Sequence, residues 1–261
     1  MTALVPIAIT GESQSVLASA STNGPDFVVT SISITPELTA VGGHITAMVT
    51  VLNKGNQSGS AGTLCLWMDK AETATVGESD DKSAAIGTLM PTQLKTLRVA
   101  LIAPPTWGTF TLRAFVDAKN ITAEADESNN QKACEYATGL PEFEILDVRI
   151  SPEIPTVGQT FTAYVIVTNS GEVAGDGGYL DLWADSSALE TRPVPGSKTE
   201  GDAYKTVGTL QPGQEKSIIV TGLKVQTATT APVLGVLIDS RAKTQEQDEE
   251  NNLFTDEYEC E

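Results

Sequence analysis

The amino-acid sequence contains one long pattern twice, at an offset of 116 residues. The first copy begins PDFVVTSISITPELTAVGGHITAMVTVLNKG at residues 25–55, and the second begins PEFEILDVRISPEIPTVGQTFTAYVIVTNSG at residues 141–171. No gap interrupts the match between these two segments, so Pro25 aligns with Pro141 and Gly55 aligns with Gly171 at the same offset. A repeat of this length is typical of a duplicated domain and not of a solenoid built from small units.

The match continues to the end of the chain. The segment GTLCLWMD aligns with GYLDLWAD at the same offset, and VDAKNITAEADESNNQKACEY aligns with IDSRAKTQEQDEENNLFTDEY at an offset of 122. The extra residues fall between periodic segments, as expected for surface loops. We therefore predict an N-terminal extended segment with a flexible linker and then two domains, at residues 1–24, 25–138 and 139–261.

Hydrophobic residues alternate with polar ones in most periodic segments. Phe161, Ala163, Val165 and Val167 occupy one face of such a segment, and Gly, Pro, Asn and Asp interrupt the pattern every 8–12 residues. This pattern is typical of antiparallel sandwiches. We predict an all-β fold of two tandem seven-stranded sandwiches, with strands near 26–34, 44–53, 61–69, 84–89, 94–102, 109–117, 130–138, 142–150, 160–169, 177–185, 204–210, 215–223, 232–239 and 252–259.

Charge and composition exclude several functions. A net charge of −18 argues against binding nucleic acid or an anionic membrane. The sequence has no run of 18 apolar residues, so we expect no membrane insertion. The single histidine, His44, leaves no Ser-His-Asp or Cys-His arrangement, and no C-x-x-C spacing suggests zinc. We therefore expect a protein that is not an enzyme.

The acidic connection before the last strand of each copy is the best candidate site. Its carboxylates are oxygen ligands of the kind that Ca²⁺ prefers, although the spacing is not that of an EF-hand. The alternative is structural, with Glu124 and Glu246 accepting backbone N–H bonds while the Asn pair caps the loop. No other cofactor is expected. The calcium candidates are Asp117, Glu124, Asp126, Glu127, Asp239, Glu246, Asp248 and Glu249.

The N-terminal segment lies outside the repeat. It contains the apolar stretch ALVPIAIT followed by a Ser-, Gly- and Ala-rich stretch. One interpretation is a disordered tail or the remnant of a preceding domain. The other is strand addition to the exposed sheet edge of a neighbouring subunit. The residues that would carry this assembly are Leu4, Val5, Ile7 and Ile9.

The repeated motifs resemble those of the CARDB family, the cell-adhesion-related domains of bacteria and archaea. They are the P-D-hydrophobic start, the V-x-N-x-G strand end, LCLWMD, IGTL and FVDAKNITAEADESNN, and both copies carry them. The resemblance covers residues 25–261. It implies fibronectin-III-like or immunoglobulin-like sandwiches strung in tandem in secreted or surface proteins, which are generally non-catalytic.

We therefore expect a non-catalytic extracellular or cell-surface adhesion protein that self-assembles into filaments through its N-terminal strand. Its partners would be copies of itself or other surface proteins. The alternative is a carbohydrate- or ligand-binding module of a larger secreted protein, with polysaccharide as the partner. Trp107, the one loop tryptophan, is the candidate ligand contact, but aromatic residues form only 5% of the chain.

Overall fold

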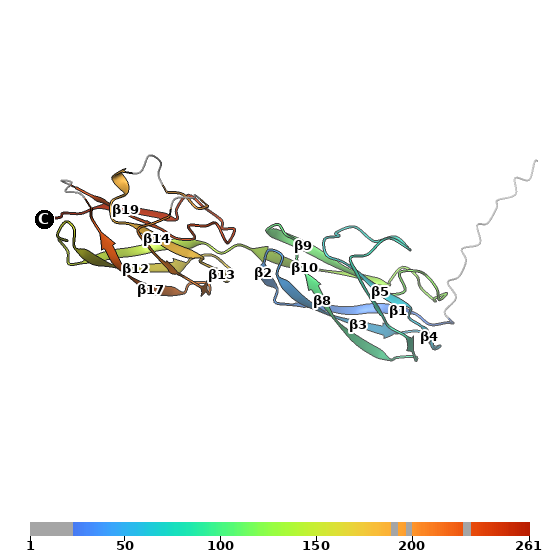
Figure 1. Cartoon of the computed structure of the whole chain (residues 1–261). Coiled ribbons are helices and arrows are strands. Elements are labelled where there is room, and N and C mark those ends of the chain that lie inside the picture. Colours follow the sequence, from blue (N-terminus) through green and yellow to red (C-terminus); the bar gives the residue numbers. More distant parts are fainter. Residues whose placement is uncertain (1–22, 189–192, 197–199, 227–230) are drawn as a thin grey trace, which may run out of the picture.

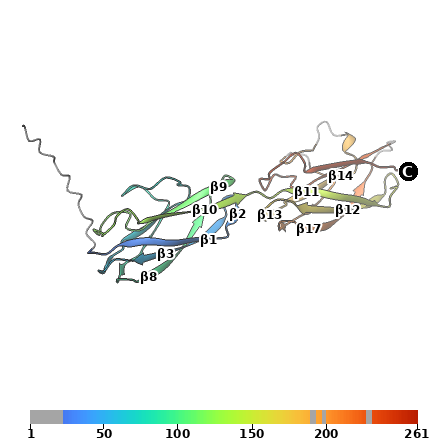
Figure 2. The same cartoon turned by 180° about the vertical axis from the view of Figure 1, so that it is seen from behind.

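The computed structural model describes residues 23–188, 193–196, 200–226 and 231–261. Two β-sandwich domains lie end to end, and the C-terminus lies at the pole farthest from the first domain (Figure 1, Figure 2). The regular elements of the described residues are strands, apart from the single 3₁₀ turn η1 (Ser186–Ala188). The prediction of an all-β chain with two tandem sandwiches is confirmed.

The first domain packs a three-stranded sheet, ordered β1-β3-β8, on a five-stranded sheet, ordered β2-β10-β9-β5-β6. The short strands β4 and β7 pair with each other beside these sheets. The elements are β1 (Phe27–Thr35), β2 (Leu38–Ala40), β3 (His44–Asn53), β4 (Gly59–Ser60), β5 (Thr63–Trp67), β6 (Lys82–Ala85), β7 (Thr88–Leu89), β8 (Leu94–Ile102), β9 (Gly108–Phe115) and β10 (Gln131–Gly139).

The second domain repeats this plan. Its sheets are ordered β11-β12-β17 and β15-β14-β18-β19, and the short strands β13 and β16 form a further pair. The elements are β11 (Phe143–Ser151), β12 (Thr160–Asn169), β13 (Gly175–Asp176), β14 (Tyr179–Trp183), β15 (Ala203–Thr206), β16 (Thr209–Leu210), β17 (Glu215–Lys224), β18 (Val233–Leu237) and β19 (Leu253–Glu257).

The fourth expected strand of each copy is subdivided. Residues 84–89 fall in β6, which pairs with β5, and in β7, which pairs with β4. Gly87 lies between them with a φ of 86°, a left-handed conformation that glycine adopts readily. Gly208, with a φ of 76°, separates β15 from β16 in the same way. In each domain, a turn at a glycine therefore takes the chain from one strand pair to another.

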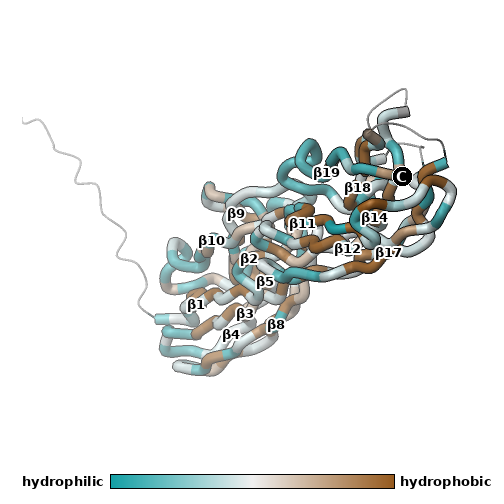
Figure 3. Tube along the Cα trace, turned by 90° about the vertical axis from the view of Figure 1, so that its left-hand side faces the viewer, coloured by the Kyte–Doolittle hydropathy of each residue, from teal (hydrophilic) through white to brown (hydrophobic). Residues whose placement is uncertain are grey.

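The alternating residues of the long strands form the core of each sandwich. Phe27, Ile45 and Val49 lie in the main core of the first domain, and hydrophobic residues concentrate along the strands while hydrophilic residues occupy the loops (Figure 3). Trp67 belongs instead to a small outer cluster covered by the loop after β5. Its indole N–H donates to the Ser79 carbonyl at 2.7 Å. This tryptophan therefore lies outside the main core of the first domain.

The connection between the domains continues the strand direction. β10 pairs with β2 up to Gly139, and the connecting Leu140 is only 4% exposed. A Cβ added at Gly139 would approach Leu38 of the first domain and Val173 of the second at 3.4 and 3.2 Å. The two domains therefore meet closely at this glycine.

Candidate functional site

The acidic loops lie at the pole where the chain enters each domain. The first joins β9 to β10 over residues 117–130, and the second joins β18 to β19 over residues 239–252. Hydrogen bonds to Phe27 and Phe143 place each loop beside the first residues of the first strand of its domain. In the second domain, this pole faces the linker.

A glutamate from each loop holds the start of the first strand. The backbone N–H of Phe27 donates to Oε2 of Glu124. The backbone N–H of Phe143 donates to Oε2 of Glu246 at 2.7 Å. The expected role of these glutamates as acceptors of backbone N–H bonds is thus present in both domains, between residues about a hundred positions apart in the sequence.

The second oxygen of each glutamate is bound by the last asparagine of the loop. Asn130 Nδ2 donates to Oε1 of Glu124 at 2.6 Å, and Asn252 Nδ2 donates to Oε1 of Glu246 at 2.9 Å. Burial raises the pKa of Glu124 to about 7 and that of Glu246 to about 8, although both hydrogen bonds oppose this rise. Both side chains therefore titrate in the neutral range.

The aspartate that begins each loop closes a local turn. Asp117 and Asp239 adopt left-handed backbone conformations, with φ of 48° and 42°. The carboxylate of Asp117 accepts the N–H groups of Ile121 and Thr122 at 3.2 and 2.9 Å. Asp239 accepts the equivalent two N–H groups at 3.1 and 2.9 Å. An aspartate side chain that bonds to nearby backbone is a common way to stabilise such a turn.

A glycine lies directly against each of these aspartates. A Cβ added at Gly62 would lie 2.4 Å from Oδ1 of Asp117, and one added at Gly178 would lie 2.1 Å from Oδ1 of Asp239. Both glycines also have positive φ, 57° and 58°. The sequence reasoning missed this role, although the G-T-L and G-Y-L motifs repeat the glycine at matching positions.

The remaining candidate carboxylates bond to their own loops. Asp126, Glu127, Asp248 and Glu249 each accept a backbone N–H from a residue two or three positions away, at distances from 2.8 to 3.2 Å. Within the described ranges, no three His, Cys, Asp or Glu side chains are grouped so as to hold a metal ion. Calcium binding stays a prediction for these loops.

A buried asparagine organises the same pole. Oδ1 of Asn53 accepts the N–H groups of Asp26 and Gly55 at 3.1 and 3.0 Å, and its Nδ2 donates to two backbone carbonyls at 2.8 and 3.0 Å. Asn169 makes the equivalent four bonds in the second domain. The V-x-N-x-G motif marks this asparagine in both copies, but it gave no sign of the bonds to the first strand.

The acidic residue after the repeated proline was also missed as a site residue. Asp26 lies 3.4 Å from the ammonium group of Lys54, which is 4.0 Å from Asp126. The equivalent positions in the second domain are Glu142 and Ser170. Because serine carries no charge, this ion-pair arrangement has no counterpart among the described residues of the second domain.

The second acidic loop holds the linker through both backbone and side-chain groups. Gln247 donates its backbone N–H to the Pro141 carbonyl and its Nε2 to the Leu140 carbonyl, each at 3.3 Å. The backbone N–H of Asp248 donates to Oε2 of Glu142 at 2.8 Å. We call residues 246–252 the linker clamp, because they fix the entering chain to the second domain.

The other candidate residues lie apart from these loops. Trp107 precedes β9, is 70% exposed and makes no ring contact with another described aromatic side chain. The Thr138 hydroxyl donates to the neighbouring Thr106 carbonyl at 2.7 Å, which places this segment beside the end of β10. The assembly candidates Leu4, Val5, Ile7 and Ile9 lie outside the described residues.

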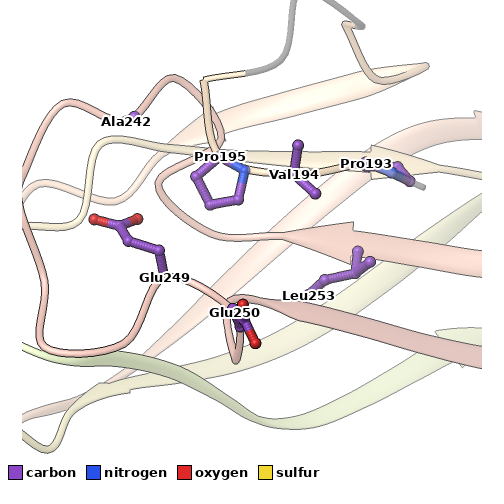
Figure 4. A pocket seen from close by; sticks show the side chains of 7 residues that line it. All are labelled: Pro193, Val194, Pro195, Ala242, Glu249, Glu250 and Leu253. Atoms are coloured by element: carbon purple, nitrogen blue, oxygen red, sulfur yellow. The ribbon is translucent and has the colours of Figure 1, made fainter. Parts of the chain in front are cut away.

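A pocket of about 550 Å³ lies beside the second acidic loop (Figure 4). The backbone N–H of Gly196 donates to the Ser240 carbonyl at 2.8 Å, which ties the segment before it to this loop. Among the described residues, the lining combines apolar contacts with two carboxylates and contains no nucleophilic side chain. It consists of Pro193, Val194, Pro195, Ala242, Glu249, Glu250 and Leu253.

Comparisons with solved structures include two single domains, each of which aligns with less than half of this chain. A domain of a predicted cell surface protein from Methanosarcina acetivorans is 23% identical, and the alignment covers 44% of this chain and 91% of that chain, with a TM-score of 0.35. A CARDB domain from Pyrococcus furiosus, solved in complex with di-metal ions, is 21% identical and covers 44% of this chain and 94% of its own, with a TM-score of 0.35.

No protein with a curated description matches the sequence. Among the described residues, no helix has the length and apolar character needed to cross a membrane. The model of the CARDB family matches residues 24–134 and again residues 140–256. The chain therefore belongs to the CARDB family, a family of adhesion-related modules of cell surfaces, and carries two copies of its domain.

Proposed function

We propose that the chain is a non-catalytic extracellular spacer that holds two adhesion-related domains in line on the cell surface. The linker clamp is the observation that carries this proposal. Gln247 and Glu246 bind the chain on either side of Glu142, so the joint has few unrestrained backbone bonds. A connector held in this way transmits orientation from one domain to the next, which a flexible tether cannot do.

The stiffness of the joint is testable by small-angle scattering. Glu246→Ala removes an acceptor from the linker clamp, so the variant should show a broader distribution of end-to-end distances than the parent. Glu124→Ala is the matched control, because it removes the same bond at the start of the first domain, away from the linker. Identical distributions for both variants and the parent would contradict the role of the clamp.

The proposed spacer self-associates through its N-terminal segment. Leu4, Val5, Ile7 and Ile9 form an apolar stretch of strand length, and such a stretch can add to an exposed sheet edge of another subunit. The partners are further copies of the chain or other surface proteins. Electron microscopy of the purified protein should show elongated particles that join into filaments, and deletion of residues 1–22 should leave single rods. Filaments formed equally well by the deletion variant would contradict this mode of assembly.

Calcium binding by the acidic loops is a separate proposal. It is supported by buried side-chain oxygens that have no hydrogen-bond partner in the described part of the chain, those of Asn130, Asn252 and Oε2 of Glu249. A ligand of the folded state stabilises that state, so Ca²⁺ should raise the Tm and EDTA should lower it. A Tm that neither reagent changes would assign the loops a purely structural role.

Carbohydrate binding is the second candidate function, and the exposure of Trp107 favours it. An exposed indole can stack on the face of a sugar ring, although a single aromatic offers a small platform. Polysaccharide pull-down with the parent, Trp107→Ala and the exposed control Tyr204→Ala tests it. Retention of the parent and of Tyr204→Ala but not of Trp107→Ala is the expected result, and no retention of the parent would remove this function.

A further inference from the structure

The second domain has an open groove along one side of its sandwich. It encloses about 1120 Å³ between β11, the edge of one sheet, and β19, the edge of the other. Apolar side chains from β11 and the turn after it line one wall, and Ile154 among them is 45% exposed. The apolar lining residues are Val148, Ile150 and Ile154. An unpaired strand edge beside apolar side chains is a template for a further strand.

The same side of the first domain is closed. There β10 lies against β1, and the ammonium group of Lys132 donates to the Thr30 carbonyl at 2.8 Å across the two strands. The equivalent residues of the second domain are Phe254 and Leu146, and the phenylalanine side chain has no donor for such a bond. Within the described residues, the gap between the edge strands is therefore peculiar to the second domain.

The charge of the groove selects its occupant. Three acidic side chains, Asp256, Glu257 and Glu259, line the wall opposite to β11. In a chain of net charge −18, most segments would be repelled from this wall, but residues 1–11 contain no charged side chain. The same residues hold the apolar stretch whose Val5, Ile7 and Ile9 alternate at the period of a strand.

The segment cannot reach the groove of its own chain. From Gln131 to Val148 the chain follows β10, the linker and β11, which at about 3.3 Å per residue spans roughly 55 Å. The stretch from Ile9 to Asn23 spans at most about 50 Å when fully extended, and Ile154 lies farther away still. A donated strand must therefore come from another copy.

We propose that the groove between β11 and β19 is the acceptor site for residues 4–9 of a second copy of this chain. This inference rests on the proposed self-association and names its acceptor. Pro6 takes a position where the acceptor strand needs no N–H donor. Because the donor is joined to the chain at one end of the rod, at Asn23, and the acceptor lies in the other domain, the contact is head-to-tail and leaves both ends open for further growth.

Two aspartate variants of the full-length chain locate the acceptor. Ile154→Asp places a charge in the groove, and Ile219→Asp places one on the outer face of β17, where the parent isoleucine is 53% exposed. Light scattering as a function of concentration should show assembly for the parent and for Ile219→Asp, but single rods for Ile154→Asp and for the chain lacking residues 1–22. Circular dichroism confirms that each variant is folded.

The possible outcomes distinguish failure of the groove as the acceptor site from failure of the proposed self-association. Loss of assembly on deletion of residues 1–22 but normal assembly of Ile154→Asp would overturn the groove and leave self-association intact. A parent that remains a single rod at every concentration would overturn self-association itself. Equal loss for both aspartate variants would overturn the groove as the specific acceptor.

Competition by a free peptide tests the same acceptor site without any substitution in the groove. An excess of the peptide Ala3–Thr10 should dissociate assemblies of the full-length parent, because it competes for the acceptor. The same peptide carrying aspartate in place of Ile7 and Ile9 should have no effect. Assemblies that persist in the presence of the unmodified peptide would contradict strand donation to this site.

Discussion

The two domains use the same hydrogen-bonded frame at the pole where the chain enters, but they differ in the charges around it. In both, a buried asparagine and a loop glutamate hold the first strand. Only the first domain adds a lysine, Lys54, which pairs with Asp26. The shared bonds are those that the fold requires, whereas the ion pair is a local addition that the second domain does without.

The largest effect should come from removing the shared asparagine. Asn53→Ala or Asn169→Ala leaves two N–H groups and two carbonyls without a partner in a buried site, so each should cost about 3 kcal/mol or more of unfolding free energy. Calorimetry should show that each substitution lowers the Tm of its own domain by a similar amount.

Asn56→Ala is the matched control for this asparagine, because Asn56 is exposed and accepts one bond, from the Gly24 N–H at 3.0 Å. A small loss of Tm for Asn53→Ala and a large loss for Asn169→Ala would show that the asparagine hydrogen bonds are not equivalent in the two domains.

The second largest loss of stability should come from substituting the glycine beside the loop aspartate. Gly62→Ala or Gly178→Ala must accommodate both a left-handed backbone, which costs roughly 1–2 kcal/mol, and a Cβ that collides with the aspartate. Gly42→Ala is the control, since Gly42 has a φ of 64° but no heavy atom within 4 Å of an added Cβ. Thermal melts should show a greater loss for Gly62→Ala than for Gly42→Ala. Equal losses would mean that the backbone alone sets the cost.

The pH dependence of the Tm should differ between the two domains, and this effect should be smaller than those of the asparagine and glycine substitutions. Each glutamate has a folded pKa above its ordinary value of 4.5, about 7 for Glu124 and about 8 for Glu246. Its contribution to stability is therefore fully present below pH 4.5 and is lost as the pH rises through the folded pKa. The Tm difference between the parent and Glu246→Gln should fall from pH 5 to pH 8, and the fall for Glu124→Gln should end at lower pH.

Glu250→Gln changes an exposed carboxylate of the same loop and is the control for this titration. Its Tm difference from the parent should not follow the same course. Parallel curves for Glu246→Gln and Glu250→Gln would show that general loop charge, not the buried glutamate, determines the pH dependence.

The smallest effect concerns the lysine that only one domain has. Lys54→Ser removes a partly exposed ion pair, which is worth about 0.5 kcal/mol and should disappear at high salt. The reciprocal variant Ser170→Lys places a cation beside Glu142 and should stabilise the second domain slightly. Melting at low and high ionic strength measures both, and a salt-independent effect would exclude an electrostatic origin.

The sequence predicted the strands well because their alternation is local. It also identified Glu124 and Glu246 as acceptors of backbone N–H bonds, because they occupy the same position in the two copies. The subdivision of the fourth strand could not be predicted, since both halves share one pattern and only the turn at Gly87 assigns them to different partners. The contact between Gly62 and Asp117 was missed for a similar reason, because it joins residues that are far apart in the chain.

Comparison of the copies could have revealed more of the site. Tyr136 and Tyr258 occupy matching positions. Each donates its hydroxyl to the backbone carbonyl that directly follows β5 or β14, at 2.9 and 2.6 Å. A tyrosine retained at the same position in both copies is a usable signal. The linker clamp gave none, because Gln247 aligns with Ala125, whose backbone N–H alone makes the corresponding bond, to Pro25.

The path of the chain through the joint has a mechanical consequence. A pulling force applied to the two ends of the rod would pass through Pro141 and Phe143 into β11, along the strand direction. The ladder bonds between β11 and β12 are perpendicular to that direction, so the load would shear many bonds at once instead of opening them one by one. The bonds from Glu246 and Gln247 share the load at the point of entry. A domain that grips its own incoming chain in this way can bear tension on a cell surface without a yielding hinge.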